Sequence, residues 1–331
     1  MQQHHKQPQH VSFMLLNNFS MIAFSACVEP LRLANYVTGK TLYTWQLFTE
    51  TGAPAQPSNG LKIEVDGSFA DIPPGPEVIV CGGIDIRKNV TRELISRLRR
   101  LALHGTSLGA VCTGAYALAK AGLLAGHRCT IHWENRDSLL DEFPGLNVTE
   151  ELFEIDRTRF TCAGGTSAID MMLSRISAMA GPQVAALVTD ELIHHRQREA
   201  DERQRMQLRA RLGVDNPKVL GVVAMMEANI EAPLSCTELA DAAGLSSRQL
   251  ERLFRRYFDE TPTRYYLHLR LSHARQLLLQ TSMAILPVGV ACGFVSASHF
   301  SKSYTDHFGR TPSEERLGTR PAQMRALAGS V

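Results

Sequence analysis

The sequence predicts two domains of different class, an α/β domain with a mostly parallel sheet followed by an all-α domain. Its 331 residues exceed the roughly 250 to 300 that a single hydrophobic core usually holds. In the first half, short β-branched or aromatic runs alternate with amphipathic helical stretches, a pattern typical of a parallel sheet covered on both faces. In the last third, one short helical pattern occurs twice in register, which indicates an internal repeat.

The composition is that of an ordinary globular protein, with 44% hydrophobic residues, 21% charged residues and a formal net charge of +2. Seven cysteines, an odd number without CxxC spacing, predict reduced thiols rather than a zinc site or a disulfide framework. Segment 1–10 lacks the apolar core of a signal peptide, and no apolar run approaches the roughly 20 residues of a membrane span. We therefore expect a cytoplasmic protein with no membrane partner.

His4, His5 and His10 lie in this polar N-terminal segment. They could chelate a metal ion, but a disordered polar tail is the expected reading. We predict no metal site and no cofactor.

Strands and helices are expected to alternate along the first domain. Each predicted strand is rich in β-branched or aromatic residues and is bounded by turn-forming residues. The second helix carries Val90, Leu94, Leu98 and Leu101 on one face. The predicted strands are 11–16, 43–49, 61–65 and 77–80, and the predicted helices are 21–36 and 89–104.

A buried strand at 106–111 is predicted to run directly into Cys112-Thr113-Gly114 and a helix at 115–121. A reactive side chain at such a tight turn, with small neighbours, has the geometry of a nucleophile elbow. The N-terminus of the helix would also lower the pKa of the Cys112 thiol and attract anions. A structural buried cysteine is the alternative, because the local motif is short.

Beyond Gly181-Pro182 a helix continues to Ile193, and the chain then becomes rich in arginine and acidic residues. We expect a solvated helix end that leads into a linker, and the alternative is a basic arm that lies near DNA. Gly213 to Pro217 marks the boundary. The predicted division is a first domain at 11–200, a linker at 201–215 and a second domain at 216–317.

The repeated pattern of the second domain is a helix-turn-helix unit. In each copy a glycine, Gly244 or Gly293, ends one helix, a serine caps the next, and apolar residues recur at helical spacing. A long amphipathic helix at 263–280 joins the two copies, with Arg264, Arg270 and Arg275 among its polar positions. The equivalent residues, 50 apart, are Leu250 and Phe300, Phe254 and Tyr304, Phe258 and Phe308, and Pro262 and Pro312.

The second helix of each copy is expected to present polar side chains on its outer face. Arginine suits phosphates and guanine edges, and a recognition helix usually contacts bases near its start. The alternative is a helical bundle with a solvated basic face, which two copies in register disfavour. The predicted DNA contacts are Arg248, Gln249, Arg252 and Arg255 in the first copy and Ser298, Ser301 and Lys302 in the second.

This last third of the chain resembles the DNA-binding domain of AraC/XylS-type transcription regulators. Two departures from the family pattern are Glu260, where a glycine often precedes Thr-Pro, and Glu314-Glu315-Arg316, where a Tyr-Arg pair is common. The resemblance implies promoter DNA and RNA polymerase as partners. The residues that carry it are Leu239-Ala240, Gly244-Leu245-Ser246, Arg248, Leu250, Phe254, Thr261-Pro262, Arg270-Leu271, Ala274-Arg275, Leu277-Leu278, Gly293-Phe294, Ser296, Phe300 and Thr311-Pro312.

The first domain is similar to class I glutamine amidotransferase-like domains of the PfpI type, and most closely to those of GlxA-type regulators, where such a domain is fused to an AraC head. The resemblance implies a flavodoxin-like α/β fold. It is carried by 111–126, 130–133, 29–35, 81–83 and 164–170.

Two departures from this pattern concern catalysis. Thr113 stands where PfpI-type hydrolases commonly carry a histidine after the nucleophile, and Ala23 stands where related proteins carry a supporting acid. Cys112 therefore lacks the adjacent base and acid of an activated nucleophile. His132 could substitute, but its neighbour Trp133 suggests a pocket wall, and we interpret the site as a degenerate active site kept as a sensor.

We expect a small-molecule effector at this site. The GlxA-type resemblance suggests an amino acid or a quaternary amine such as glycine betaine, carnitine or arginine. Trp133 and Phe19 could stack on a cation, and the helix N-termini at Thr113 and Thr166 could hold a carboxylate. The predicted ligand residues are Asn18, Phe19, Gly83, Ile84, Cys112, Thr113, His132, Trp133 and Thr166.

The expected function is that of a ligand-responsive transcription regulator, an activator of a catabolic operon that acts as a homodimer and is not an enzyme. One alternative is a cysteine-dependent amidohydrolase or protease with an appended DNA-binding domain. The other is a constitutive architectural DNA binder, in which about half of the chain would have no role.

Overall fold

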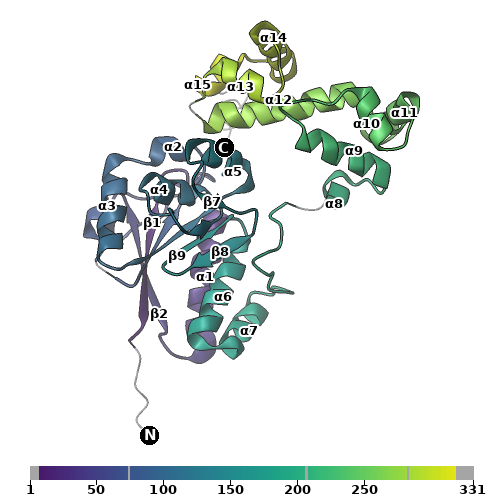
Figure 1. Cartoon of the computed structure of the whole chain (residues 1–331). Helices are drawn as coiled ribbons and strands as arrows, with labels where there is room; N and C mark the ends of the chain where they lie inside the picture. Colours follow the sequence, from purple (N-terminus) through teal and green to yellow (C-terminus); the bar gives the residue numbers. More distant parts are fainter. Residues whose placement is uncertain (1–6, 74, 206–207, 282, 318–331) are drawn as a thin grey trace, which may run out of the picture. The chain divides into compact units, whose positions relative to one another are not determined.

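The computed structural model describes residues 7–73, 75–205, 208–281 and 283–317, and the chain separates into two compact units, 1–205 and 206–331 (Figure 1). The first unit is built on a seven-stranded sheet with the strand order β3-β2-β1-β4-β5-β9-β8. Its neighbouring strands are parallel except for the β8–β9 pair. The strands are β1 (Gln9–Leu15), β2 (Tyr43–Thr49), β3 (Gly67–Ser68), β4 (Glu77–Cys81), β5 (Ser107–Val111), β8 (Phe153–Asp156) and β9 (Arg159–Cys162), and β6 (Arg128–Cys129) pairs separately with β7 (Asn147–Val148).

Helices cover both faces of this sheet (Figure 1). On β1, Phe13 and Leu15 pack into the core on one face, and Met14 packs into the core on the other. A strand buried on both faces is expected to be mostly apolar, and the buried part of β1 is apolar except for Ser12. The first face is covered by α1 (Met21–Thr38), α6 (Ser167–Ala180) and α7 (Pro182–Glu191), and the second by α2 (Ile86–Asn89), α3 (Arg92–Leu103), α4 (Ala115–Lys120) and α5 (Arg136–Glu142).

Most predicted elements of this unit are confirmed, and one is wrong. The strand predicted at 61–65 is absent. Leu61 is 57% exposed, and Ile63 forms only an isolated bridge with Ala55, because Gly67–Ser68 takes the edge position beside β2. Helix α3 begins at Arg92 rather than at 89, because the Thr91 hydroxyl accepts a hydrogen bond from Leu94 N and caps it.

The prediction of a disordered N-terminal tail is wrong for His10. The structure places this residue inside β1, with its Nδ1 3.0 Å from Thr44 Oγ1. His4 and His5 lie outside the described residues. Within the part of the chain that the structure describes, no helix combines the length and apolar composition needed to cross a membrane.

The second unit is all helical, and its long helix α12 contributes to two small cores. Tyr266 packs into the first core, and Leu271 and Ala274 pack into the second. The predicted equivalence of the two copies is confirmed, since Leu250, Phe254, Phe300 and Tyr304 are all fully buried. The helices are α8 (Leu208–Leu212), α9 (Pro217–Ala228), α10 (Cys236–Ala242), α11 (Ser247–Phe258), α12 (Pro262–Gln280), α13 (Ile285–Ala291), α14 (Ala297–Phe308) and α15 (Pro312–Leu317).

Two arginines predicted at polar positions of α12 instead hold this unit together. Arg270 donates hydrogen bonds of 2.7 Å to the carbonyls of Cys292 and Gly293, so it fixes the turn of the second helix-turn-helix copy to α12. Arg275 lies 3.3 Å from Glu315, a carboxylate that is only 3% exposed. Of the two glutamates in the acidic ending, Glu315 is therefore part of the core, paired with arginine.

In the turn that closes the first copy, the residue that stands in place of glycine lies one position earlier than predicted. Asp259, not Glu260, adopts the left-handed conformation, with φ of 57°, and its equivalent in the second copy is Gly309 with φ of 69°. The carboxylate of Glu260 instead lies 3.1 Å from His268 Nδ1.

The arginine-rich stretch after α7 is not a solvated linker. Arg198 pairs with the buried Asp170 at 2.7 Å, and Arg196 pairs with Glu202 at 2.5 Å. Residues up to Arg205 thus belong to the first unit, whereas α8 packs against α9 in the second.

Candidate ligand site and DNA interface

The predicted ligand residues follow strands that end at the same edge of the sheet. Leu15 pairs with Cys81, Cys81 with Val111, and Val111 with Cys162, so the ends of β1, β4, β5 and β9 form one row. Ligands of open α/β sheets bind outside the carboxyl ends of the strands. The loops that carry Asn18, Gly83, Cys112 and Thr166 all leave from this row.

Backbone hydrogen bonds join the loops after β1, β4 and β5 into one layer. The amide of Ile84 donates to Asn18 O at 3.0 Å, and the hydroxyl of Thr113 donates to Gly83 O at 2.7 Å. A Cβ on Gly83 would lie 2.1 Å from Asn18 O, so only glycine permits this approach. The predicted residues of these three loops therefore lie together.

Cys112 occupies the elbow that the sequence predicts. Its φ of 58° is in the left-handed region, at a tight turn between β5 and α4. Such a conformation costs a non-glycine residue about 1 to 3 kcal/mol and is typical of functional sites. Gly164, from the loop after β9, packs against it, since a Cβ at Gly164 would lie 2.7 Å from Cys112 Cβ.

The prediction that the helix N-terminus lowers the pKa of this thiol is wrong on balance. Burial raises the pKa of Cys112 to about 11, and this outweighs the lowering effect of the Thr113 backbone amide, while the charge of Glu134 raises it further. Cys112 is therefore protonated near neutral pH.

His132 lies beside the elbow but is directed elsewhere. Its backbone amide donates to Cys112 O at 3.4 Å, whereas its Nδ1 accepts from Glu134 N and lies 3.8 Å from the Glu134 carboxylate. Burial lowers the pKa of His132 against the raising effect of Glu134, so the ring is neutral near pH 7. These contacts direct the Nδ1 of His132 toward Glu134.

The two aromatic residues predicted to stack on a cation, Phe19 and Trp133, differ in their burial. Phe19 is fully buried and packs edge-on against Phe24 at 5.8 Å, so its prediction as a cation-stacking face is wrong. Trp133 is half-buried, and the guanidinium of Arg205 lies over its ring at 4.5 Å. The Trp133 face thus already holds a cation supplied by the chain itself.

At the N-terminus of α6, the hydroxyl of Thr166 accepts a hydrogen bond of 2.9 Å from Arg198. Sequence reasoning identified Thr166 and Trp133 but missed Arg198 and Arg205, because it assigned the arginine-rich stretch to a linker. The abundance of arginine was a visible signal, but its partners are distant in sequence.

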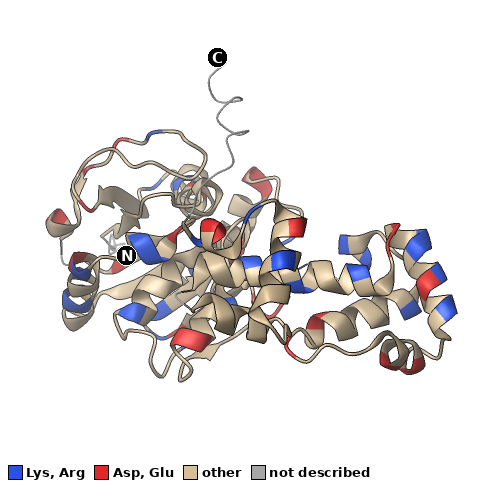
Figure 2. Cartoon of the chain, turned by 90° about the horizontal axis from the view of Figure 1, so that it is seen from above, with Lys and Arg blue, Asp and Glu red and all other residues tan. Residues whose placement is uncertain are grey.

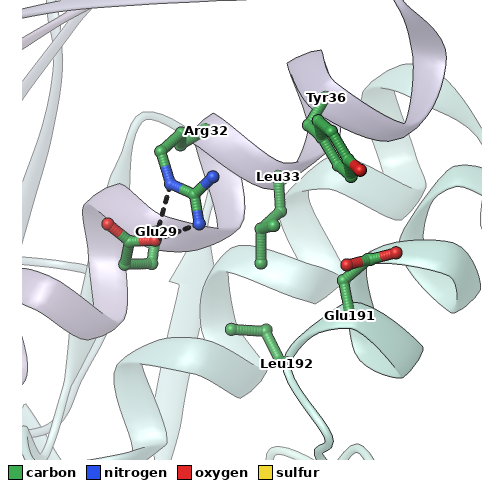
Figure 3. A pocket seen from close by; sticks show the side chains of 6 residues that line it. All are labelled: Glu29, Arg32, Leu33, Tyr36, Glu191 and Leu192. Atoms are coloured by element: carbon green, nitrogen blue, oxygen red, sulfur yellow. Dashed lines mark hydrogen bonds and ion pairs between the residues drawn. The ribbon is translucent and has the colours of Figure 1, made fainter.

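Two pockets lie elsewhere on the first unit. One, of about 440 Å³, is lined on α1 and the end of α7, and two of its charged residues, Glu29 and Arg32, pair with each other at 2.6 Å (Figure 3). The other, of about 590 Å³, lies at the amino ends of β1 and β4, where the buried Glu77 pairs with Arg175. Neither pocket is lined by the predicted ligand residues, and in each of them one carboxylate pairs with one arginine.

The predicted DNA contacts lie on α11 and α14. Arg248, Arg252 and Arg255 are exposed on α11, which carries the basic positions seen at the right of Figure 2. On α14, Ser298 and Lys302 are exposed at the positions equivalent to Arg248 and Arg252.

Two of the residues predicted to contact DNA are less available for it. Gln249 completes a capping box, in which its side-chain oxygen accepts from Ser246 N at 2.8 Å, and Ser301 is half-buried. Each second helix therefore presents two or three exposed polar side chains on one face.

An α/β unit with an elbow cysteine, followed by two helix-turn-helix copies, defines a DNA-binding regulator built on an enzyme-like fold. Residues 10–178 match the DJ-1/PfpI family, and residues 239–318 match a helix-turn-helix domain.

Relatives along nearly the whole chain agree with this class. The transcriptional regulator GbdR of Pseudomonas aeruginosa is 46% identical over 313 residues, covering 95% of this chain and 85% of that protein. The regulator CdhR of the same species is 44% identical over 304 residues, covering 92% and 90%. A crystal structure of an AraC family transcriptional regulator from Pseudomonas putida aligns with a TM-score of 0.52 at 30% identity, covering 56% of this chain and all of that one.

The chain therefore belongs to the AraC family of transcription regulators in which a DJ-1/PfpI domain precedes the helix-turn-helix domain.

Proposed function

We propose that this regulator is an effector-responsive activator of a catabolic operon, with the effector bound at the loop layer around Cys112. The observation that carries the proposal is the combination of a strained, positioned elbow with a protonated thiol that lacks a base. A protonated thiol is not activated as a nucleophile, which favours a binding role for this elbow. We infer that the domain senses a metabolite and does not transform it.

The effector is proposed to be an amino acid or a quaternary amine, such as glycine betaine, carnitine or arginine. Support comes from Trp133, whose ring already accommodates the guanidinium of Arg205. A tryptophan face attracts quaternary ammonium and guanidinium cations through its quadrupole. With the cation of such a ligand on Trp133, its carboxylate would lie near Cys112 and His132.

The two helix-turn-helix copies are proposed to read successive major-groove segments on one face of the DNA. The exposed arginines of α11 and the exposed Ser298 and Lys302 of α14 would supply the contacts. We further propose that the protein acts in the cytoplasm, as a homodimer, and contacts RNA polymerase at the promoter. Coupling requires that the effector binds unequally to two states of the protein.

A thermal-shift screen of zwitterionic metabolites on the full chain tests the sensor role. A true effector should raise the Tm with increasing concentration, since it binds the folded state only. The matched variant Trp133→Ala should lose this response. Hydrolysis of an amide or peptide that disappears in Cys112→Ala would instead favour the cysteine-dependent enzyme.

A further inference from the structure

One apolar side chain of the DNA-binding unit lies almost completely in solvent. Val295 is 99% exposed, the largest fraction among the large apolar side chains that the structure describes. It lies in the turn between α13 and α14, the two helices of the second helix-turn-helix copy (Figure 1). It directly precedes Ser296, the residue that caps α14. This end of the second helix is the one that enters the major groove in helix-turn-helix proteins.

Comparison of the two copies shows why Val295 is exposed. In the first copy, Leu245 precedes the cap of α11 and packs against the core that includes Leu250. Such a contact is a hydrophobic staple, which fixes the entry of the chain into the helix. The second copy has one more residue between its turn glycine and Phe300, the equivalent of Leu250. Phe294 makes the corresponding contact there, with its ring 5.1 Å from that of Phe300, and Val295 is the additional residue.

The backbone on both sides of Val295 is held in place. Arg270 donates a hydrogen bond of 2.7 Å to Gly293 O, and its guanidinium lies 4.4 Å from the centre of the Phe294 ring. The hydroxyl of Ser296 caps α14 by accepting a hydrogen bond of 3.2 Å from a backbone amide. A β-branched side chain also has few rotamers. Val295 is therefore presented in a nearly fixed position, so little conformational entropy is lost when it contacts a partner.

The chemistry of valine determines which base it can recognise. In the major groove thymine presents a methyl group, whereas the other three bases present hydrogen-bond donors and acceptors. A valine packed on one of those polar groups would bury it without a partner, which costs free energy. Packing on the thymine methyl group instead removes apolar surface of both partners from water. The base that fits Val295 is therefore thymine.

We propose that Val295 is a specificity residue of the second helix-turn-helix copy and recognises one thymine through its 5-methyl group. This inference rests on the proposed function, in which both copies enter the major groove, and deepens it by naming a base. Val295 precedes the cap of α14 by one residue and Ser298 follows it by two, so both belong to the end of the helix that lies in the groove. Ser298 and Lys302 supply polar contacts, and Val295 supplies the apolar one.

The test compares thymine with deoxyuridine, which differs only by the missing methyl group. A DNA site is first selected from random duplexes with the full wild-type chain. Each thymine of the site is then replaced singly by deoxyuridine, and binding is measured by fluorescence anisotropy at one salt concentration. The proteins are the wild type, Val295→Ala and the matched control Val290→Ala. Val290 is 53% exposed on α13, the helix that crosses the DNA backbone in this motif, so it should not reach a base.

For the wild type and for Val290→Ala, we expect one thymine at which deoxyuridine lowers the association constant about fourfold, the effect of losing roughly one buried methyl group. In Val295→Ala the same replacement should cost less than about twofold, because most of the apolar surface that covers the methyl group is gone. On the unmodified site, Val295→Ala should bind about fourfold more weakly than the wild type. Its Tm should be unchanged, since the exposed side chain is not part of the core.

Deoxyuridine effects of equal size in the wild type and in Val295→Ala at every position would overturn the inference, as would a selected site in which no thymine responds. Either result would assign the exposed valine to a protein partner instead. If the selected site binds sequence-specifically and depends on Arg252, such a result leaves the proposed function intact and refutes the inference alone. If the wild type selects no preferred sequence, the proposed reading of the major groove fails, and the inference fails with it.

Discussion

Cys112 should react with iodoacetamide far more slowly than an ordinary thiol. Because burial raises its pKa to about 11, only about one molecule in 10⁴ carries the reactive thiolate at pH 7. An unperturbed thiol with a pKa of about 8.5 is about 3% thiolate at that pH, so the expected ratio of rates is about 300. Between pH 7 and pH 10 the rate should rise about tenfold per unit, because a raised pKa keeps the thiol protonated throughout that range.

The assay is mass spectrometry of the peptide that contains Cys112, with glutathione in the same tube as the reference thiol. The effector should slow labelling of Cys112 further. Labelling at pH 7 as fast as glutathione would refute the reasoning, because it would require a stabilised thiolate at the elbow. The enzyme alternative would regain support if a hydrolytic rate were also lost in Cys112→Ala.

Four further outcomes are expected. Replacing Arg252 with Ala should weaken DNA binding by about 1 to 3 kcal/mol and relax specificity at one base pair, whereas an equal loss on all sequences would make it a phosphate contact. The DNA association constant should fall as salt rises, and each phosphate contact should add about 0.9 to the steepness of log K against log salt. An affinity that does not change with salt would exclude the exposed arginines of α11 as the interface. Asp259→Gly should raise the free energy of unfolding by about 0.5 to 1 kcal/mol in urea titration, because Asp259 has φ of 57°. Gly309→Ala should lower it by a similar amount, and the reverse signs would contradict the left-handed conformation of these two turns. Asp170→Asn should lower the free energy of unfolding by about 3 to 5 kcal/mol, because it leaves Arg198 without its buried charge partner. A loss below about 1 kcal/mol would show that this ion pair does not hold the segment after α7.

The features that the sequence predicted well are set by local rules. Helix caps and apolar spacing located the repeat, and the buried equivalents Leu250 and Phe300 followed from that register. The elbow at Cys112 was equally local, because a buried strand that passes into small residues and a helix specifies the turn by itself. Parallel strands then bring the loops at Asn18, Gly83 and Cys112 to one edge without further information.

The features that sequence reasoning missed depend on partners distant along the chain. Whether Phe19 faces a ligand or the core depends on Phe24 and the packing of α1 against the sheet, and the packing decides for the core. The net effect on the Cys112 pKa depends on burial, which a motif does not report. The arginines after α7 read as solvated charge because Asp170 and Trp133, their partners, are 28 or more residues away.

In the proposed function, the elbow site senses an effector and passes the signal to DNA binding. The most direct test measures the affinity of the full chain for a DNA site selected from random duplexes, at one salt concentration, with and without saturating effector. We expect the DNA affinity to change by at least about fivefold, equivalent to about 1 kcal/mol of coupling. In Cys112→Ala the effector-free affinity should be unchanged and only the response to effector altered. Identical affinities with and without a ligand that demonstrably binds at Trp133 would contradict the account.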